Sequence, residues 1–215
     1  MNIIKEVDLK KRILEISYKN KSSHIGSCLT CVDIIDAIYK AKDEDEPFVL
    51  SNGHAGLALY VILEKYLGLD AEKLYKKHGT HPSRDKVDGI YCSTGSLGQG
   101  LPIALGMALE NKKKNVYCMT SDGEWSEGSM WESLRIASEQ ELDNLWIFVS
   151  ANGYGAYKEI NSERLEWQIA SFVKNNCPRV SFVKTDIKEY PDFLQGLAGH
   201  YHVMNKNEYE QAVKV

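Results

Sequence analysis

Two short apolar segments, with a segment of helical periodicity between them, constrain the fold of this chain most strongly. Residues 115–120 and 145–149 have the composition of buried β-strands, and residues 127–141 repeat apolar positions at helical spacing. A strand, a helix and a strand in this order form a crossover whose two strands lie parallel and side by side. We therefore predict an α/β fold, a parallel β-sheet flanked by helices on both faces, in a single domain spanning residues 1–215.

Polar residues follow both of these strands. Asp122 and Gly123 come after the first strand, and Asn152 comes after the second. Ligands bind beyond the carboxyl ends of parallel strands, so the carboxylate and the amide oxygen are expected to lie near each other. Such hard oxygen ligands suit Mg²⁺ or Ca²⁺, which would take further oxygens from a phosphorylated ligand. Gly123 permits a tight turn, and the helix start after it offers N–H groups to phosphate.

These residues and their companions resemble a known cofactor fingerprint. Asp122-Gly123-Glu124 followed by Asn152-Gly153 resembles the thiamine diphosphate motif. Glu127-Gly128-x-x-x-Glu132 and Leu142-Asp143-Asn144-Leu145 narrow the resemblance to the N-terminal, diphosphate-binding domain of transketolases. The resemblance runs from His24 to about Asn152 and continues more thinly to the C-terminus. Family members carry a further long stretch beyond that point, so the chain looks trimmed there.

The resemblance implies a role for each matching residue. The implied metal ligands are Asp122, Asn152 and the backbone carbonyl of Tyr154. The implied cofactor-binding residues are His54, Gly95, Ser96, Leu97, Asp122, Gly123, Glu124, Asn152 and His200. The histidines expected to face the sugar or to move protons are His24, His54, His81 and His200. Glu127 and Glu132 are expected at a subunit interface.

Several of these assignments have an alternative. His24 and His200 could be ordinary loop or surface histidines, and His78 competes with His81, which is favoured by the proline that follows it. The segment Gly95-Ser96-Leu97 could belong to a glycine-rich surface loop. Glu127 and Glu132 could lie on a solvated helix face.

Two positions depart from the family pattern. Ser121 stands where the family usually has glycine, and Ser150 stands where it usually has aspartate. Neither residue is an implied metal ligand, so metal binding is expected to persist. Ser121 adds a side chain near the expected diphosphate position, which could shift the geometry or the affinity.

Periodicity and the resemblance together predict the remaining elements. Strands are expected over residues 48–50 and 179–185. Helices are expected over residues 5–20, 30–40, from about 54 to 67, 71–78, after Gly100, 164–174 and 207–212. Thr30 is expected to cap the second of these helices, because its side chain can accept a hydrogen bond from a first-turn N–H group.

Composition excludes several classes of protein. The chain has 215 residues and a formal net charge of −4, which gives no basic excess for nucleic acid. No apolar run approaches the ~18 residues of a membrane helix, and the start lacks the features of a signal peptide, so a cytoplasmic protein is expected. The five cysteines are odd in number and irregularly spaced, which indicates reduced thiols. Cys28-x-x-Cys31 lacks a second pair for zinc.

The resemblance implies a thiamine diphosphate-binding subunit that transfers a two-carbon ketol unit between sugars, phosphorylated or nucleotide-linked, with Mg²⁺ or Ca²⁺. The pyrimidine-binding domain, whose glutamate activates the cofactor, does not fit in 215 residues. A pyrimidine-binding subunit is therefore expected as a separate partner chain in an α₂β₂ assembly, with this chain inactive alone. The alternatives are a 2-oxo acid dehydrogenase α-type or deoxyxylulose phosphate synthase-like subunit, or a non-catalytic cofactor-binding subunit.

Overall fold

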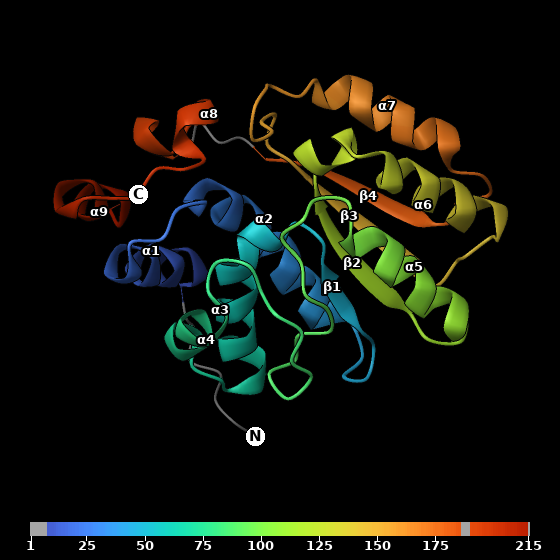
Figure 1. The fold of residues 1–215 in the computed structure, drawn as a ribbon, viewed down its shortest axis with the longest axis horizontal. Helices are drawn as coiled ribbons and strands as arrows, with labels where there is room; N and C mark the ends of the chain where they lie inside the picture. The colour runs from blue at the N-terminus through green and yellow to red at the C-terminus, as the bar shows by residue number, and fades with distance from the viewer. Residues whose placement is uncertain (1–7, 186–189, 215) are drawn as a thin grey trace.

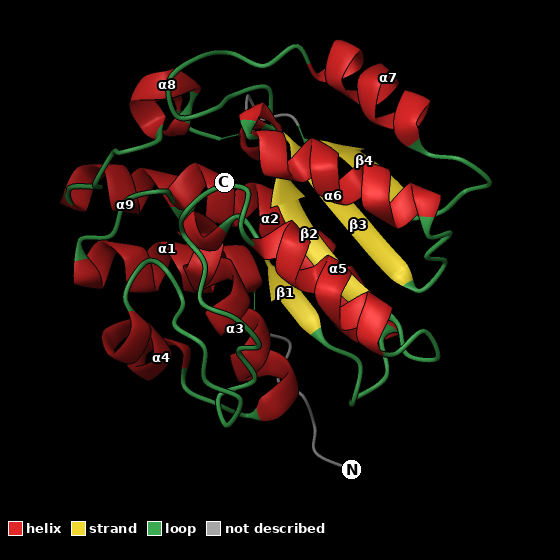
Figure 2. Cartoon of the chain, turned by 45° about the vertical axis from the view of Figure 1, so that its right-hand side comes forward, coloured by secondary structure: helices red, strands yellow, loops and turns green. Residues whose placement is uncertain are grey.

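A four-stranded parallel sheet forms the centre of the molecule (Figure 1), as expected from the sequence. A computed structural model describes residues 8–185 and 190–214, and residues 5–7 of the first predicted helix lie outside these ranges. The strands lie in chain order: β1 (Phe48–Leu50), β2 (Val116–Ser121), β3 (Leu145–Ala151) and β4 (Arg179–Lys184). Figure 2 shows them running in one direction with α5 and α6 in front. All the carboxyl ends therefore meet at one edge.

Helices cover both faces of the sheet. One face carries α1 (Leu9–Asn20), α2 (Ile25–Ala41), α3 (Gly56–Leu67) and α4 (Ala71–His78). The other carries α5 (Gly100–Glu110), α6 (Gly128–Glu139) and α7 (Ser162–Phe172). After β4 the chain returns to the first face through η4 (Asp192–Leu194), α8 (Gly196–Gly199) and α9 (Lys206–Ala212). Two single turns, η1 (Gly53–Ala55) and η2 (Gly123–Ser126), follow β1 and β2.

Alternation along the strands divides the apolar residues between two cores. Phe48 and Leu50 pack with α1–α4, whereas Val49 between them packs with α5–α7. In the same way Met119 faces the first core and Cys118 faces the second. Successive side chains of a strand point to opposite faces, and a parallel sheet buried on both sides needs apolar residues on each. This explains why β2 reads as a nearly continuous apolar run.

Asn144, in the Leu-Asp-Asn-Leu motif, has a structural task. Its side-chain amide donates hydrogen bonds to the carbonyl oxygens of Ala108, Asn111 and Lys114, at 3.0, 3.2 and 3.0 Å. The backbone carbonyl of Asn144 accepts a hydrogen bond from the N–H of Val116 at 2.8 Å. One buried side chain thus satisfies the end of α5 and the turn that leads into β2. The motif sets the position of β2 at the amino end of the sheet.

The start of α2 differs from the prediction. The helix begins at Ile25 and not at Thr30, so Thr30 is an interior residue and the prediction that it caps the helix was wrong. His24 holds the N-cap position in a left-handed conformation (φ 62°) without a side-chain cap. Polar side chains at Ser22, Ser23 and Ser27 suggested a turn there, but the helical segment extends through Ser27 because Ile25, Cys28 and Leu29 are buried on one face.

Candidate active site

A cavity of about 260 Å³ opens at the carboxyl ends of the strands. Its walls come from the segments that follow β1, β2 and β3, from the start of α2, from the loop before α5 and from the residues after α8. Parallel sheets place ligand sites at this edge, since the connections to the helices diverge there. The sequence prediction put the site in the same place.

Asp122 joins the ends of β2 and β3. Its side chain is 1% exposed, and its two carboxyl oxygens accept the N–H groups of Gly123 and Gly153, each at 2.8 Å. Burial raises the pKa of Asp122 to about 6, although the two backbone donors oppose that rise. Two backbone N–H groups hold the carboxyl group, and no lysine or arginine among the described lining residues offsets its negative charge.

The other two predicted metal ligands lie beside Asp122. The amide oxygen of Asn152 accepts the N–H of Tyr154 at 2.9 Å, which holds the turn after β3. A Cβ on Gly123 would stand 3.8 Å from the carbonyl oxygen of Tyr154 and 2.8 Å from the Cα of Gly155. The two turns therefore touch, and only glycine fits at Gly123. The structure brings the three predicted ligands to one place.

The donor set at this place fits a divalent cation and a polar ligand. Of the described residues that line the cavity, none is a lysine or an arginine. Asn52 lines the cavity, and its buried amide oxygen has no hydrogen-bond partner among the described residues. Buried polar atoms are nearly always paired, so an unpaired one on a residue that lines the same cavity as Asp122 indicates a bound group. Carboxylate and carbonyl oxygens are the ligands that Mg²⁺ and Ca²⁺ prefer.

Four histidines gather over the cavity. The ring of His24 lies 5.7 Å from that of His54, 6.0 Å from that of His81 and 4.6 Å from that of His200, centroid to centroid. His54 comes from η1, His81 from the loop after α4, and His200 from the end of α8. Tyr201 packs edge-on against His24 and His200. The prediction that these four histidines share one site agrees with this arrangement.

Burial keeps three of these rings neutral at pH 7. Burial first, and the neighbouring imidazoles second, lower the pKa of His54 to about 3 and that of His24 to about 4. Burial also lowers the pKa of His200. A neutral imidazole can donate through one nitrogen and accept through the other. The cluster can therefore both donate hydrogen bonds to hydroxyl groups and accept hydrogen bonds from them.

Comparison with known proteins identifies the family. A family model described as the thiamine diphosphate binding domain of transketolase matches residues 8–172. This chain belongs to the transketolase thiamine diphosphate-binding domain family. Transketolases of solved structure share its fold: that of Campylobacter jejuni superposes with a TM-score of 0.71 at 22% identity, and one from Pichia stipitis with 0.72 at 20%. They align over 100% of this chain, which covers 43% and 41% of theirs.

Several relatives are short proteins of similar size. An apulose-4-phosphate transketolase subunit from Phocaeicola vulgatus is 29% identical, over 95% of this chain and 90% of that protein. The 6-deoxy-6-sulfo-D-fructose transketolase subunit SqwG from Clostridium sp. is 30% identical, over 80% of this chain and 74% of the relative. Human transketolase is 37% identical over 62% of this chain, which spans only 25% of the human protein.

The remaining predicted cofactor residues of this transketolase-type domain fall into two groups. Gly95 and Leu97 line the cavity, and a Cβ on Gly95 would stand 2.8 Å from the ring of His81. Ser96 and Glu124 are absent from the lining residues: Ser96 is exposed and Glu124 is fully buried. Contact of these two with a cofactor stays a prediction.

The predicted interface glutamates and the alternative histidine lie outside the cavity. Glu127 and Glu132 are exposed at and after the start of α6. His78 contacts a carboxyl oxygen of Asp88 at 2.8 Å, and Lys77 reaches the same carboxyl group at 2.7 Å. His78 is therefore hydrogen-bonded away from the cavity, and the ammonium group of Lys77 is the cation that pairs with the Asp88 carboxyl group.

The five cysteines are all free, as expected. Cys28 and Cys31 are buried in α2, and burial raises their pKa values to about 12 and about 11. Both are therefore protonated thiols at neutral pH, which neither bind metal nor react readily.

Sequence reasoning missed several residues of the cavity wall: Ser27, Thr30, Cys31, Asn52, Tyr157 and Tyr201. The spacing in the sequence could have identified three of them. Ser27, Thr30 and Cys31 follow His24 at spacings that place them on one side of a helix. Asn52 is the variable position of the Ser-x-Gly-His motif, which the prediction treated as a spacer. Both departures from the family pattern, Ser121 and Ser150, line the cavity.

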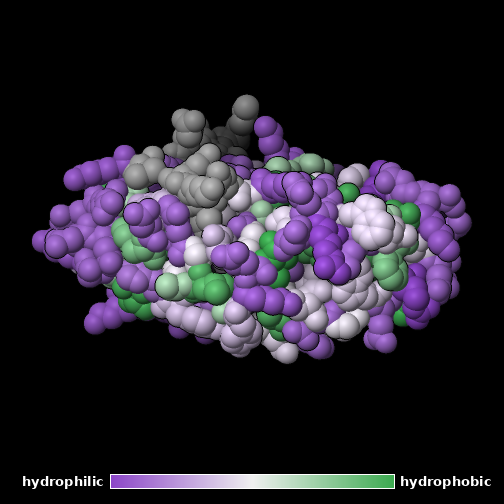
Figure 3. All heavy atoms as spheres, turned by 90° about the horizontal axis from the view of Figure 1, so that it is seen from above, coloured by the Kyte–Doolittle hydropathy of each residue, from purple (hydrophilic) through white to green (hydrophobic). Residues whose placement is uncertain are grey.

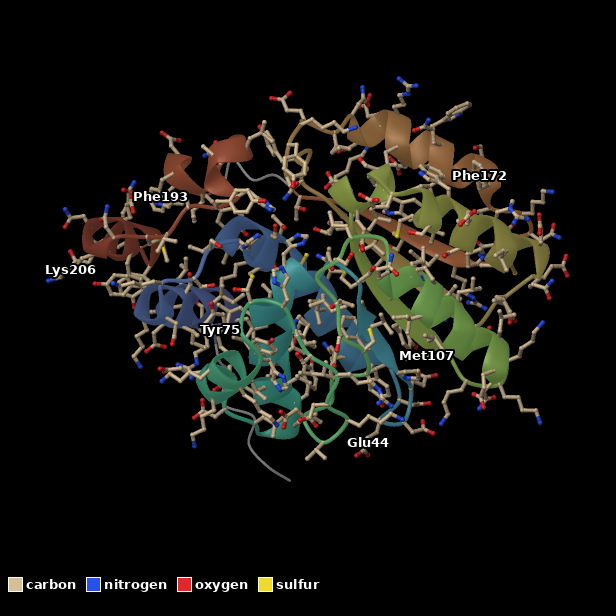
Figure 4. The ribbon with its side chains drawn as sticks, viewed as in Figure 1. Glu44, Tyr75, Met107, Phe172, Phe193 and Lys206 are labelled. Atoms are coloured by element: carbon tan, nitrogen blue, oxygen red, sulfur yellow. The ribbon has the colours of Figure 1, made fainter. Side chains whose placement is uncertain are left out.

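Outside this cavity, the surface has a second hollow and small hydrophobic patches (Figure 3). A larger hollow of about 520 Å³ opens at the amino ends of the strands, beside Pro47 and Val116. Figure 4 places Met107 on α5 and Glu44 on the loop between α2 and β1 at this end. Seen from above in Figure 3, hydrophobic residues form small separate patches among hydrophilic ones. Within residues 8–185 and 190–214, no helix combines the length and apolar composition that a membrane crossing requires.

Proposed function

We propose that this chain is the thiamine diphosphate-binding subunit of a split transketolase-like enzyme, which transfers a two-carbon ketol unit between sugars. The observation that carries the proposal is the meeting of Asp122, Asn152 and the Tyr154 carbonyl at the strand ends, directly below the histidine cluster. The match to a transketolase subunit of similar size, over nearly the whole of both chains, supports this assignment.

The diphosphate end of the site would be held by a divalent cation and by backbone. Asp122, Asn152 and the Tyr154 carbonyl would bind Mg²⁺ or Ca²⁺, and the N–H groups that begin η2 would meet a phosphate oxygen. A cation is required because the described lining has no lysine or arginine to offset the negative charges of a diphosphate. Bound thiamine diphosphate would supply the carbanion chemistry at its thiazolium ring.

The histidines would bind the sugar and move protons. His24 at the start of α2 and His81 in the loop after α4 both line the cavity and would hold sugar hydroxyl groups. His54 and His200, which the resemblance also assigns to the cofactor, would accept or return the proton of a reacting hydroxyl group. All three histidines with lowered pKa values are neutral at pH 7, so each ring can accept a hydrogen bond through one nitrogen and donate one through the other.

A partner chain would complete the site. The cofactor's aminopyrimidine needs a glutamate on its far side, and the described glutamates do not line this cavity. The pyrimidine-binding partner would supply it, together with any cation that grips a substrate phosphate. Glu127 and Glu132 are exposed where such a partner could bond to them. We propose an α₂β₂ assembly in the cytoplasm, acting on a sugar or sugar phosphate, as the name of the Phocaeicola vulgatus relative indicates for that protein.

Reconstitution tests the proposal. The chain is mixed with the product of a neighbouring open reading frame that encodes a pyrimidine-binding domain, and ketol transfer and 2-oxo acid decarboxylation are assayed with thiamine diphosphate and Mg²⁺. Ketol transfer by the mixture supports the proposal. Decarboxylation alone would reassign the chain to another thiamine diphosphate enzyme, and cofactor binding without either activity would indicate a non-catalytic subunit.

A further inference from the structure

Glu124 is a buried carboxyl group that bonds to two segments of the cavity wall without lining the cavity itself. Its side chain is 0% exposed. One oxygen, Oε1, accepts the hydroxyl of Ser51 at 2.6 Å and the N–H of Gly98 at 2.9 Å. Ser51 follows β1, and Gly98 belongs to the loop before α5. A single oxygen atom therefore connects two segments that are remote in sequence.

Both of these segments carry predicted cofactor residues. His54 comes three residues after Ser51, and Leu97 directly precedes Gly98. The segments are packed so closely that a Cβ on Gly53 would stand 2.6 Å from Thr94, and one on Gly100 would stand 2.5 Å from the Ser51 hydroxyl oxygen. A larger side chain in place of Gly53 or Gly100 would not fit between the two segments. Their spacing is set by contacts at this junction.

A third element reaches the same junction. Glu124 lies in η2, two residues after Asp122, so its backbone is tied to the predicted metal site. On the other side of the loop, the carbonyl of Gly98 accepts the hydroxyl of Ser129 on α6 at 2.7 Å. The end of β1, the turn after β2 and the loop before α5 are thus held together around one carboxyl group.

The cost of burying Glu124 indicates that its bonds matter. A buried carboxyl group is unfavourable unless it is hydrogen-bonded, and its second oxygen, Oε2, has no partner among the described residues. An apolar side chain of similar size would fill the space without this penalty, but it would leave the Ser51 hydroxyl and the Gly98 N–H without an acceptor. The hydrogen bonds fix the register of the two segments, which apolar contact does not.

We propose that Glu124 is a positioning residue of the cofactor site. By accepting from Ser51 and Gly98 with one oxygen, it fixes the segment that carries His54 against the segment that carries Gly95 and Leu97. The inference rests on the proposed function, because thiamine diphosphate is the ligand that these segments would hold. In this role Glu124 acts through the two segments that it holds together.

Two substitutions separate positioning from mere filling of space. Glu124→Gln keeps an acceptor oxygen in place, whereas Glu124→Ala removes it. Glu139→Ala, on the exposed end of α6, is the matched control. The measurements are the dissociation constant of thiamine diphosphate with Mg²⁺, by titration calorimetry on the full chain with its partner, and the hydrogen-exchange rate of the Gly98 amide without cofactor.

Glu124→Ala is expected to weaken cofactor binding at least about tenfold, the equivalent of one lost buried hydrogen bond, and to speed Gly98 exchange. Glu124→Gln should stay within about threefold of the unsubstituted chain, as should the control. Equal losses in the Gln and Ala variants, or unchanged Gly98 exchange in Glu124→Ala, would overturn the proposal.

If Glu124→Ala does not fold, Ser51→Ala decides in its place, because it removes one of the two donors. Weaker cofactor binding in Ser51→Ala supports the positioning role, and unchanged binding overturns it. Failure of the unsubstituted chain to bind thiamine diphosphate would contradict the proposed function instead. The Gly98 exchange rate needs no cofactor and would still decide whether Glu124 holds the loop.

Discussion

The backbone N–H of His24 donates a hydrogen bond to the carbonyl oxygen of His200, 3.0 Å away. This bond joins the start of α2 to the residues that follow α8, near the other end of the chain, and it sets the two rings 4.6 Å apart. His24 has a left-handed backbone, which costs a residue other than glycine roughly 1–2 kcal/mol. The C-terminal return of the chain therefore stabilises an unfavourable backbone at the centre of the histidine cluster.

Replacing His24 or His81 by alanine should impair the reaction and spare cofactor binding. Both are expected to hold the sugar and not the diphosphate, so kcat should fall or KM for the sugar should rise by about tenfold or more. Steady-state kinetics with the partner chain measures this, with His202→Ala as the control, because His202 pairs with Glu208 away from the cavity. A variant that lost cofactor affinity at unchanged KM would refute the role given to that histidine.

Replacing Asp122 by alanine should abolish the stabilisation that thiamine diphosphate and Mg²⁺ confer. Asp122 is the only carboxylate among the described lining residues. A ligand at one hundred times its dissociation constant stabilises a protein by about 2.7 kcal/mol, which thermal unfolding detects easily. The melt is run with and without ligands, with the partner present if the chain alone shows no shift. Equal shifts in the variant and the unsubstituted chain would exclude Asp122 as a ligand.

His54 should make the stability of the chain depend on pH. Burial lowers its pKa from 6.5 to about 3, so the folded state binds fewer protons than the unfolded state between these values. The stability from neutral His54 is therefore present above pH 6.5 and lost as the pH falls toward 3.

Urea unfolding of the chain and of His54→Gln at about pH 7.5 and about pH 5 measures this effect. Between these conditions the unfolding free energy of the chain, relative to the variant, should fall by about 2 kcal/mol. A difference that stayed constant would show that His54 titrates like an exposed histidine.

Two glycines of α5 should respond to alanine in opposite ways. A Cβ on Gly106 meets nothing within 4 Å, so Gly106→Ala should stabilise the isolated chain by about 0.5–1 kcal/mol through helix propensity. A Cβ on Gly100 would stand 2.4 Å from the Ser51 Cα, so Gly100→Ala should destabilise it by about 1–3 kcal/mol. Denaturant unfolding compares them, and a stabilising Gly100→Ala would show that the junction with Ser51 is loose.

The sheet could be predicted from local sequence because its strands are short apolar runs bounded by turn residues. Residues 116–121 and 145–151 pair in parallel as the strand, helix and strand order requires. Asp122 and Asn152 then had to lie at one edge, which is a consequence of topology and not of detailed packing. The start of α2 was predicted wrongly because the nearby serines suggested a turn, whereas the helix, with Ile25 and Cys28 buried, begins at Ile25.

The rest of the site depends on contacts between distant segments. Nothing near Glu124 in the sequence indicates that it is buried beneath the loop that contains Gly98. His200 reaches His24 because the C-terminal segment packs back across α1 and α2, and local periodicity does not encode such a return. Only the resemblance placed His200 in the site, and it gave no role to Tyr201 or Asn52, which also line the cavity.

The exchange rate of the C2 proton of thiamine diphosphate tests the central claim most directly. The claim is that this chain holds the diphosphate side of the cofactor and leaves its activation to a partner, since the described glutamates do not line the cavity. NMR follows the exchange with the chain alone, the pyrimidine-binding partner alone and the mixture. The account predicts slow exchange with either chain and fast exchange with both. Fast exchange with this chain alone would contradict it.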